Sequence, residues 1–291
     1  MVDVTDLPYR LLCRKAGASL AYTEMIYISA ILHENKKTKD LMSTSREDKP
    51  IGLQITGNNV SEFSKVLPYL SPYNLIDINC GCPSIRITGN QAGSFLLKNP
   101  EKIASMIKIL KQSGKPVTAK IRLGFHKNNA VKIAKTIEKA GADALTVHAR
   151  LAIHGSSVPA DHKWTKKIKE SIGIPLIANG DIFTGEQTAE LLDFADGVMI
   201  ARGAIGNPLI FRNILHYLKT GKEKQTTTEE KLKQFEIYLK LVKQHKLIDI
   251  HRIKHLGSSF LSGFKGASSF RNKLMFMKNI DEIENLVSQI H

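Results

Sequence analysis

The chain has 291 residues, 42% of them hydrophobic, which is enough for one full-sized α/β core. Its mean hydropathy of −0.15 and the lack of an apolar run of about twenty residues argue against a membrane span. Lysine and arginine total 42 against 27 acidic residues, a formal net charge of +15. This surplus favours a polyanionic partner, although a general lysine bias would also produce it.

The N-terminal segment and the cysteines indicate a compartment. The opening residues, MVDVTDLPYR, contain acidic side chains and no apolar core, so no secretory signal is expected. Cys13, Cys80 and Cys82 are too few for a disulfide framework and suit a reducing cytoplasm. They form neither a CxxC pair nor a zinc-site spacing, so we expect no bound metal. Nothing suggests an obligate oligomer, and we expect a monomer.

Short apolar, β-branched segments alternate with amphipathic segments along most of the chain. One helix is expected at 100–112, with Ile103, Met106, Ile107 and Leu110 on one face, and another at 129–140. Buried strands that alternate with helices predict a parallel sheet covered on both sides. The expected strands are 20–25, 51–56, 75–79, 117–122, 144–148, 174–179 and 197–201.

At this length and spacing we predict an α/β fold, a (β/α)8 TIM barrel followed by a small C-terminal α-helical domain. An open doubly wound sheet is the competing architecture. Seven strands are visible, so the first strand should be a stub at Met1–Val2 or lie upstream.

Three segments are expected: a barrel at 1–221, a polar linker at 222–230, and a helical domain at 231–291. Gly221 ends a helix, and the threonines of the linker supply an N-cap for the next one. The C-terminal helices are expected at 231–245, 251–264, 268–277 and 280–290, as a bundle with its own small core.

The segment DINCGCP, residues 77–83, gives the strongest chemical signal. It follows a β-branched run, and Pro83 turns the backbone immediately after Cys82. Such a turn presents Cys82 at the C-terminal end of a strand, where parallel barrels hold their chemistry. A small buried hydrophobe is the alternative reading of an isolated cysteine.

Other strands also end in polar groups. Taken singly, Lys120 could be a surface lysine, His148 a core histidine, and the turn at 179–181 only a turn. A polar group at the end of so many strands is harder to obtain by chance. The set comprises Gln54, Asn79, Lys120, His148, Asn179-Gly180-Asp181 and Ala201-Arg202-Gly203.

The last two groups predict a phosphate site. Gly180 and Gly203 would let the backbone approach a phosphate, and Arg202 would clamp it beside a helix N-terminus. Barrels commonly bind phosphate in the loops after their last two strands. We therefore expect a phosphorylated cofactor at the barrel mouth, with Lys120 and Gln54 against a polar ring system.

These motifs together resemble the tRNA-dihydrouridine synthases, flavin enzymes that reduce uridine in tRNA. The resemblance covers nearly the whole chain and is most specific at DINCGCP followed by AGS. It extends over VTDLPYR, IGLQITG, QAGSFLLKNP, AKIRLG, TVHAR, IANGDI, ARGAIGNPLIF and, in the tail, KHLGSSFLSGFKGASSFR.

The resemblance implies FMN as cofactor and NADPH as electron donor. Reduced flavin would deliver hydride from N5 to C6 of uracil, and Cys82 would protonate C5, since a thiol protonated at neutral pH can act as a general acid. The implied cofactor-binding residues are Met1, Val2, Gln54, Lys120, His148, Asn179, Gly180, Asp181, Ala201, Arg202 and Gly203.

The resemblance also implies a tRNA partner whose target base leaves its stack. Asn79 would orient the uracil, and Arg150 is expected to contact the substrate. Lys254, His255 and Arg271 of the tail are candidate RNA contacts, and a solvated helix face is the alternative for each. The loop 151–162 departs from the family pattern, so altered substrate contacts are expected there. Two alternatives stay open: a free-pyrimidine flavin oxidoreductase similar to dihydroorotate dehydrogenase, and a non-catalytic tRNA-binding barrel.

Overall fold

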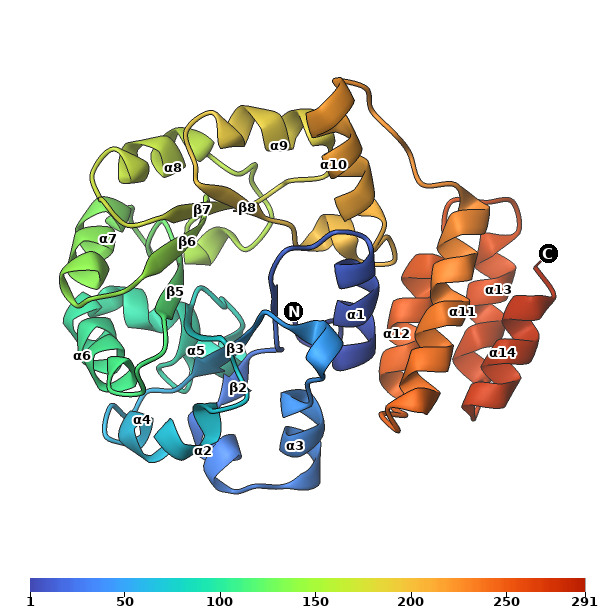
Figure 1. The fold of residues 1–291 in the computed structure, drawn as a ribbon, viewed down its shortest axis with the longest axis horizontal. Coiled ribbons are helices and arrows are strands. Elements are labelled where there is room, and N and C mark those ends of the chain that lie inside the picture. The colour runs from blue at the N-terminus through green and yellow to red at the C-terminus, as the bar shows by residue number, and fades with distance from the viewer. Residues whose placement is uncertain (291) are drawn as a thin grey trace.

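The computed structural model describes residues 1–290. One parallel sheet curls around a central axis, with helices on its outside (Figure 1). Its order is β1-β3-β4-β5-β6-β7-β8, with β2 also pairing with β3. The strands are β1 Ala21–Tyr22, β2 Ile26–Tyr27, β3 Ile51–Thr56, β4 Leu75–Cys80, β5 Val117–Arg122, β6 Ala144–His148, β7 Leu176–Asn179 and β8 Gly197–Met199. The predicted barrel-type α/β fold is confirmed.

The sheet differs from the prediction at its first strand. Within residues 1–290, β1 and β8 are the ends of the sheet and do not pair with each other. The expected stub at Met1–Val2 is wrong, because the Met1 carbonyl accepts hydrogen bonds from the backbone N–H groups of Val4 and Thr5 and closes a turn. Of the expected strand 20–25 only β1 forms, and a second short strand, β2, begins just after it at Ile26.

Helices cover the outer face of the sheet. The prediction of helices near 100–112 and 129–140 is confirmed by α6 Pro100–Lys111 and α7 Ala130–Lys139. Every residue of β3 is buried, because the barrel interior covers one face of the strand and helices cover the other. The other barrel helices are α1 Leu7–Lys15, α2 Ile28–Leu32, α3 Lys36–Met42, α4 Glu62–Lys65, α5 Ile85–Thr88, α8 His162–Lys169, α9 Gly185–Leu192 and α10 Ile210–Thr220.

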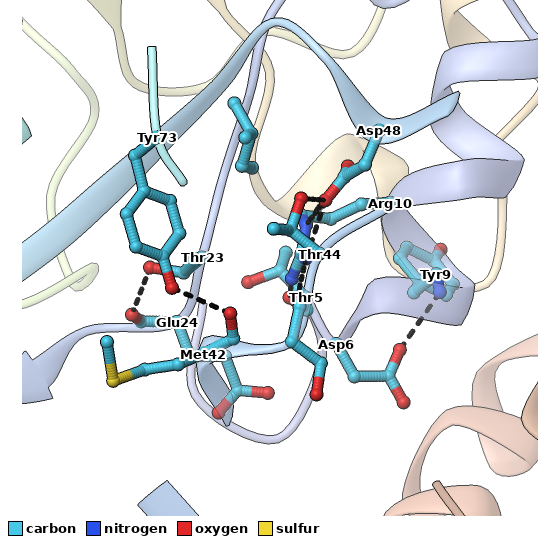
Figure 2. A network of polar contacts seen from close by, with 12 residues as sticks. Thr5, Asp6, Tyr9, Arg10, Thr23, Glu24, Met42, Thr44, Asp48 and Tyr73 are labelled. Atoms are coloured by element: carbon cyan, nitrogen blue, oxygen red, sulfur yellow. Dashed lines mark hydrogen bonds and ion pairs between the residues drawn. The ribbon is translucent and has the colours of Figure 1, made fainter. Parts of the chain in front are cut away.

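Helix α1 is fixed to the chain before β3 by a buried arginine. Arg10 forms an ion pair with Asp48, Nη2 to Oδ2 at 2.7 Å, and both side chains are almost fully buried. The remaining guanidinium N–H groups donate to the carbonyls of Thr5 and Ser43. Figure 2 shows this network, with Thr44 donating to the same carboxylate. A buried charge is tolerated here because each nitrogen of the guanidinium group donates to an acceptor.

The C-terminal helices lie beside α1 and follow an extended connection from α10 (Figure 1). They are α11 Thr228–Gln244, α12 Ile250–Phe260, α13 Ala267–Phe276 and α14 Ile280–Ser288. The predicted threonine N-cap is Thr227, which forms a reciprocal capping box with Glu230. Helix α11 therefore begins inside the segment predicted as linker.

The tail does not have a core of its own, contrary to the prediction. Tyr9 of α1 packs edge-on against Tyr238 and Phe260, with 6.1 Å between ring centroids in each pair. The same apolar cluster contains Leu7 and Leu12 of α1. An amphipathic bundle needs a partner for its apolar face, and α1 provides it.

No helix within residues 1–290 is both long and apolar enough to cross a membrane.

Candidate active site

The C-terminal ends of the strands bring the predicted polar side chains to one edge of the sheet. In the parallel register, Asn79 lies beside Lys120, and His148 lies beside Asn179. Gln54 lies opposite Asp77 on the neighbouring strand. Side chains that lie far apart in the sequence thus surround the barrel mouth.

Lys120 points into this site and is not a surface lysine. Its Nζ donates to Oδ1 of Asn179 at 2.9 Å, and Nδ2 of Asn179 donates to the Met199 carbonyl at 2.8 Å. These bonds connect β5, β7 and β8. Burial lowers the pKa of Lys120 to about 8, although the Asp77 carboxylate acts in the opposite direction. Burial penalises the charge of the Lys120 ammonium group. A polar or anionic ligand group next to Lys120 would therefore stabilise its charged form.

Cys82 sits in a turn that the Asn79 side chain builds. The Asn79 Oδ1 accepts hydrogen bonds from the backbone N–H groups of Gly81 at 3.1 Å and Cys82 at 2.9 Å. This asparagine turn carries the chain outward after β4. Cys82 is partly exposed, whereas Cys13 and Cys80 are buried. The reading of Cys82 as a fully buried hydrophobe is therefore wrong.

The AGS sequence downstream supports the same turn. The backbone N–H of Ser94 donates to the Cys82 carbonyl at 3.0 Å. Gly93 has a φ of +59°, and a Cβ there would lie 2.8 Å from the Cys82 carbonyl oxygen. Both its backbone conformation and its contact with Cys82 therefore require glycine.

His148 is held neutral by its surroundings. Arg150 donates from Nη1 to Nε2 of His148 at 3.0 Å, so this ring nitrogen accepts. Burial, together with the charges of Lys120, Arg122 and Arg150, lowers the pKa of His148 to about 2. The imidazole can accept hydrogen bonds at neutral pH and does not carry a positive charge.

Asp181 joins two arginines at the ends of β6 and β8. Its carboxylate accepts from Arg150, which is almost fully buried, and from Arg202, which is half exposed. Burial alone would raise the pKa of Asp181, but the hydrogen bonds from Arg150 and from the Ala160 backbone hold it below its ordinary value. Arg202 thus forms an ion pair within the chain, and its exposed half can still contact a ligand.

The two glycines of the predicted phosphate site are required by packing within the protein. A Cβ on Gly180, whose φ is +123°, would lie 2.9 Å from Cδ2 of His148. A Cβ on Gly203 would lie 2.8 Å from the Ile182 carbonyl oxygen. The sequence-based explanation, approach to a phosphate, is therefore not needed to account for either residue.

The remaining predicted cofactor residues lie at the edges of the site. The Met1 amino group donates to Oγ1 of Thr5 at 2.7 Å, and burial lowers its pKa to about 6, with Glu24 and Lys120 as charged neighbours. Val2 is exposed. The Ala201 carbonyl accepts from the Ala204 N–H at 3.0 Å in the turn after β8.

Sequence reasoning missed Arg122, which holds the Cys82 turn to the loop after β6. Its Nε donates to the Gly81 carbonyl at 2.9 Å, and its Nη1 donates to the carbonyls of Leu151 and Gly155. The side chain is buried, and burial together with the charge of Arg150 lowers the pKa of Arg122 to about 10. The sequence does place Arg122 at the end of a buried strand, and this position could have identified it as a site residue.

The predicted RNA-contacting residues of the tail are on α12 and α13 and do not join the barrel site. Nζ of Lys254 donates to the Met275 carbonyl at 2.9 Å, and Nη1 of Arg271 donates to the Leu261 carbonyl at 2.8 Å. His255 is exposed. All three are accessible or partly accessible.

The site residues fit a flavin cofactor. Amide groups of Gln54 and Asn179 lie with the Lys120 ammonium at the mouth, a donor set suited to a polar ring system, and Arg202 offers a partly exposed charge for a phosphate. Residues 1–290 contain no group of three or more His, Cys, Asp or Glu side chains placed to hold a metal ion.

Solved structures share the barrel architecture at low sequence identity. An old yellow enzyme homologue from Zymomonas mobilis aligns with a TM-score of 0.54 and 13% identity, over 78% of this chain and 86% of that one. Histamine dehydrogenase from Rhizobium sp. 4-9 aligns with a TM-score of 0.51 and 13% identity, over 73% of this chain and 42% of that one. These likenesses support the fold.

Sequence comparisons identify the family. The family model for Dihydrouridine synthase (Dus) matches residues 1–290. A probable tRNA-dihydrouridine synthase of Rickettsia conorii is 32% identical over 100% of this chain and 91% of that protein. The tRNA-dihydrouridine synthase B of Pseudomonas aeruginosa is 32% identical over 97% of this chain and 88% of that protein. The chain therefore belongs to the dihydrouridine synthase family, and the enzyme class predicted from its motifs, a flavin-dependent oxidoreductase, is confirmed.

Proposed function

We propose that this protein reduces the C5=C6 bond of a uridine in tRNA to give dihydrouridine. The observation that carries the proposal is the position of Cys82. It is the one partly exposed cysteine within residues 1–290, and Asn79 and Ser94 hold its backbone at the end of β4, beside Lys120. A thiol there can give a proton to a substrate lying over the barrel mouth.

FMN would supply the hydride for C6 when bound, and NADPH would supply the electrons. FMN would be held by Gln54, Lys120, Asn179 and Arg202, with the neutral His148 as a further hydrogen-bonding partner. Lys120 would stabilise negative charge on the ring system. Its buried ammonium group donates to an amide, not to a carboxylate, so a negative charge beside it would be favourable for both groups.

On the substrate side, Cys82 would transfer its Sγ proton to C5 of the uracil ring while Asn79 and Arg150 hold the base in place. The orientation of the base matters more than the number of hydrogen bonds to it, because correct orientation alone can raise the rate of such a step by several orders of magnitude. Arg122 would keep the Cys82 turn and the loop after β6 in register.

A tRNA substrate accounts for the charge of the chain. A formal net charge of +15 destabilises the compact state through self-repulsion and is offset by RNA phosphates. Lys254, His255 and Arg271 on the tail would contact the tRNA body while the barrel holds the target base. We expect the enzyme to act as a monomer on tRNA in the cytoplasm.

The test is dihydrouridine formation on unmodified tRNA transcripts with FMN and NADPH, followed by nucleoside mass spectrometry. We expect product from the wild type and a loss of about a hundredfold or more in Cys82→Ala with flavin content unchanged. Cys80→Ala, which removes a buried thiol two positions away, is the matched control and should keep the activity.

Absence of product from a flavin-loaded, tRNA-binding wild type would contradict the proposal. Product from free uracil derivatives but not from tRNA would support the free-pyrimidine oxidoreductase in its place. Full activity of Cys82→Ala would remove the proton-donor role alone.

A further inference from the structure

A continuous chain of hydrogen bonds runs beneath the site across β3, β4 and β5. It begins at Asp77, a fully buried residue of β4. The Asp77 carboxylate accepts from Oγ1 of Thr118 at 2.6 Å and from Nε2 of Gln54 at 2.8 Å. Oε1 of Gln54 accepts from Nδ2 of Asn79 at 2.8 Å. The Asn79 Oδ1 then accepts the N–H groups of the Cys82 turn.

The chemistry of the two ends fixes every amide in this chain. An ionised carboxylate can only accept, so Gln54 must turn its NH₂ group toward Asp77 and its oxygen toward Asn79. At the other end, two backbone N–H groups require an acceptor, so Asn79 must turn its oxygen toward Cys82. Both requirements agree, and neither amide can rotate without leaving buried groups unpaired.

The consequence is that Asn79 has a single hydrogen-bonding group left for a ligand. One N–H of its amide goes to Gln54, and within residues 1–290 no acceptor takes the other. Its oxygen is already shared by two donors. Asn79 can therefore donate to a substrate and cannot accept from it.

We propose that Asp77 is a positioning residue that sets the orientation of the Gln54 and Asn79 amides, so that Asn79 presents an N–H to a carbonyl oxygen of the pyrimidine. This inference rests on the proposed function for the identity of the ligand. Asp77 itself does not touch the substrate; it acts through Gln54.

Asp77 orients Gln54 most strictly when it is ionised, because the ionised carboxylate cannot donate. Tyr22 on β1, Cys80 on β4 and Lys120 on β5 are the titratable groups around it, and only Lys120 carries charge at neutral pH. Burial raises the pKa of Asp77 to about 6, against the hydrogen bonds of Thr118 and Gln54. A protonated Asp77 can still accept from Gln54 with its carbonyl oxygen, provided that its O–H donates to Thr118.

Two substitutions of Asp77 separate orientation from charge. Asp77→Asn can keep its oxygen on Gln54, because the Thr118 hydroxyl is able to accept as well as donate. We expect turnover close to that of the wild type, because amide orientation and not the charge of Asp77 is what the chain requires. Asp77→Leu has no acceptor, and we expect kcat per bound flavin to fall by about ten- to a hundredfold. Thr118→Val, which leaves the Gln54 contact in place, is the control and should change kcat little.

A second measurement works without turnover. The rate at which iodoacetamide alkylates Cys82 should change severalfold in Asp77→Leu and stay unchanged in Asp77→Asn and Thr118→Val, since the Cys82 turn is the far end of the chain. Buried Cys13 and Cys80 react slowly and do not obscure this rate.

Wild-type kcat and alkylation rate in Asp77→Leu would overturn the inference, as would a tenfold or greater loss of kcat in Asp77→Asn. If Asp77→Leu fails to fold, the kcat of Asp77→Asn decides, because a tenfold loss there would show that charge and not amide orientation matters. A wild type that makes no dihydrouridine would overturn the proposed function, while the alkylation rates would still decide the role of Asp77.

Discussion

At the scale of single residues, the site depends on side chains whose charge is set by their surroundings. Lys120 loses solvation and is paired with an amide, not with a carboxylate. His148 accepts from an arginine and stays neutral. Asp181 is held ionised between Arg150 and Arg202. Perturbed groups of this kind gather where a fold binds charged ligands or carries out proton transfer.

Gly93→Ala tests the support under Cys82. A Cβ at this position meets the Cys82 carbonyl and the left-handed backbone is strained for alanine, so we expect a loss of about 1–3 kcal/mol in the free energy of unfolding and a clear loss of turnover. Gly114→Ala is the matched control, because its φ is also positive at +71° but no atom lies within 4 Å of its Cβ. Equal effects of both changes on turnover would show that the Cys82 contact does not matter.

The neutral His148 predicts a pH dependence of stability. The unfolded chain gains a proton on this histidine as the pH falls through its ordinary pKa of 6.5, but the native state, with a pKa of about 2, does not. The unfolded state binds more protons, so the free energy of unfolding falls as the pH drops below about 6.5. Urea unfolding at pH 7.5 and 5.5 should show the wild type losing about 1 kcal/mol more than His148→Gln. An equal loss in both proteins would mean that His148 titrates normally.

At the scale of elements, helix α1 connects the barrel with the tail. Its Tyr9 hydroxyl donates to the Ala204 carbonyl and accepts from the Gly206 N–H at 3.0 Å, which attaches α1 to the turn after β8. Its opposite side packs into the tail cluster. Arg252 of α12 reaches back to Glu24 beyond β1, with Nη2 and Oε1 3.2 Å apart. Tail and site are therefore parts of one packed structure.

Tyr238→Phe tests this junction. The Tyr238 hydroxyl donates to Oδ2 of Asp6 at 2.9 Å, and both groups are buried. Removing it leaves a buried carboxylate oxygen with one partner fewer, so we expect a loss of about 1–2 kcal/mol in the free energy of unfolding. Thermal and urea unfolding should give one shared transition for barrel and tail. Two separate transitions would contradict the shared core.

At the scale of the whole molecule, the proposed function requires two regions that contact a large anionic substrate. The barrel mouth would hold the base, and Lys254 and Arg271 on α12 and α13 would contact the RNA body; Figure 1 shows these helices in the tail beside the barrel. Deletion of the tail would expose the apolar side of α1, so point variants are the better probe of RNA binding.

Lys254→Gln and Arg271→Gln should weaken tRNA binding through lost phosphate contacts. Each should lower the slope of log affinity against log salt concentration by about 0.9 if it removes one contact. Lys135→Gln on α7, on the opposite side of the barrel from the tail in Figure 1, is the charge-matched control and should leave the slope unchanged. Equal slopes for all variants would show that these tail residues do not contact phosphates.

The sequence alone determined the alternation of strands and helices, the threonine that caps α11, and the polar residues that end the strands. These follow from local periodicity and from short motifs, so they can be read without knowing the contacts. The same locality explains why the boundaries of α6 and α7 were predicted closely.

Only the tertiary structure decided how these parts meet. Tyr238 and Asp6 are 232 positions apart, and no local pattern shows that α1 completes the core of the tail. The orientation of the Asn79 amide, the pairing of Asp181 with two arginines, and the packing that requires Gly180 likewise depend on neighbours from other strands. Residue types follow from the chain, whereas hydrogen-bond partners and protonation states follow from burial among residues that the fold brings together.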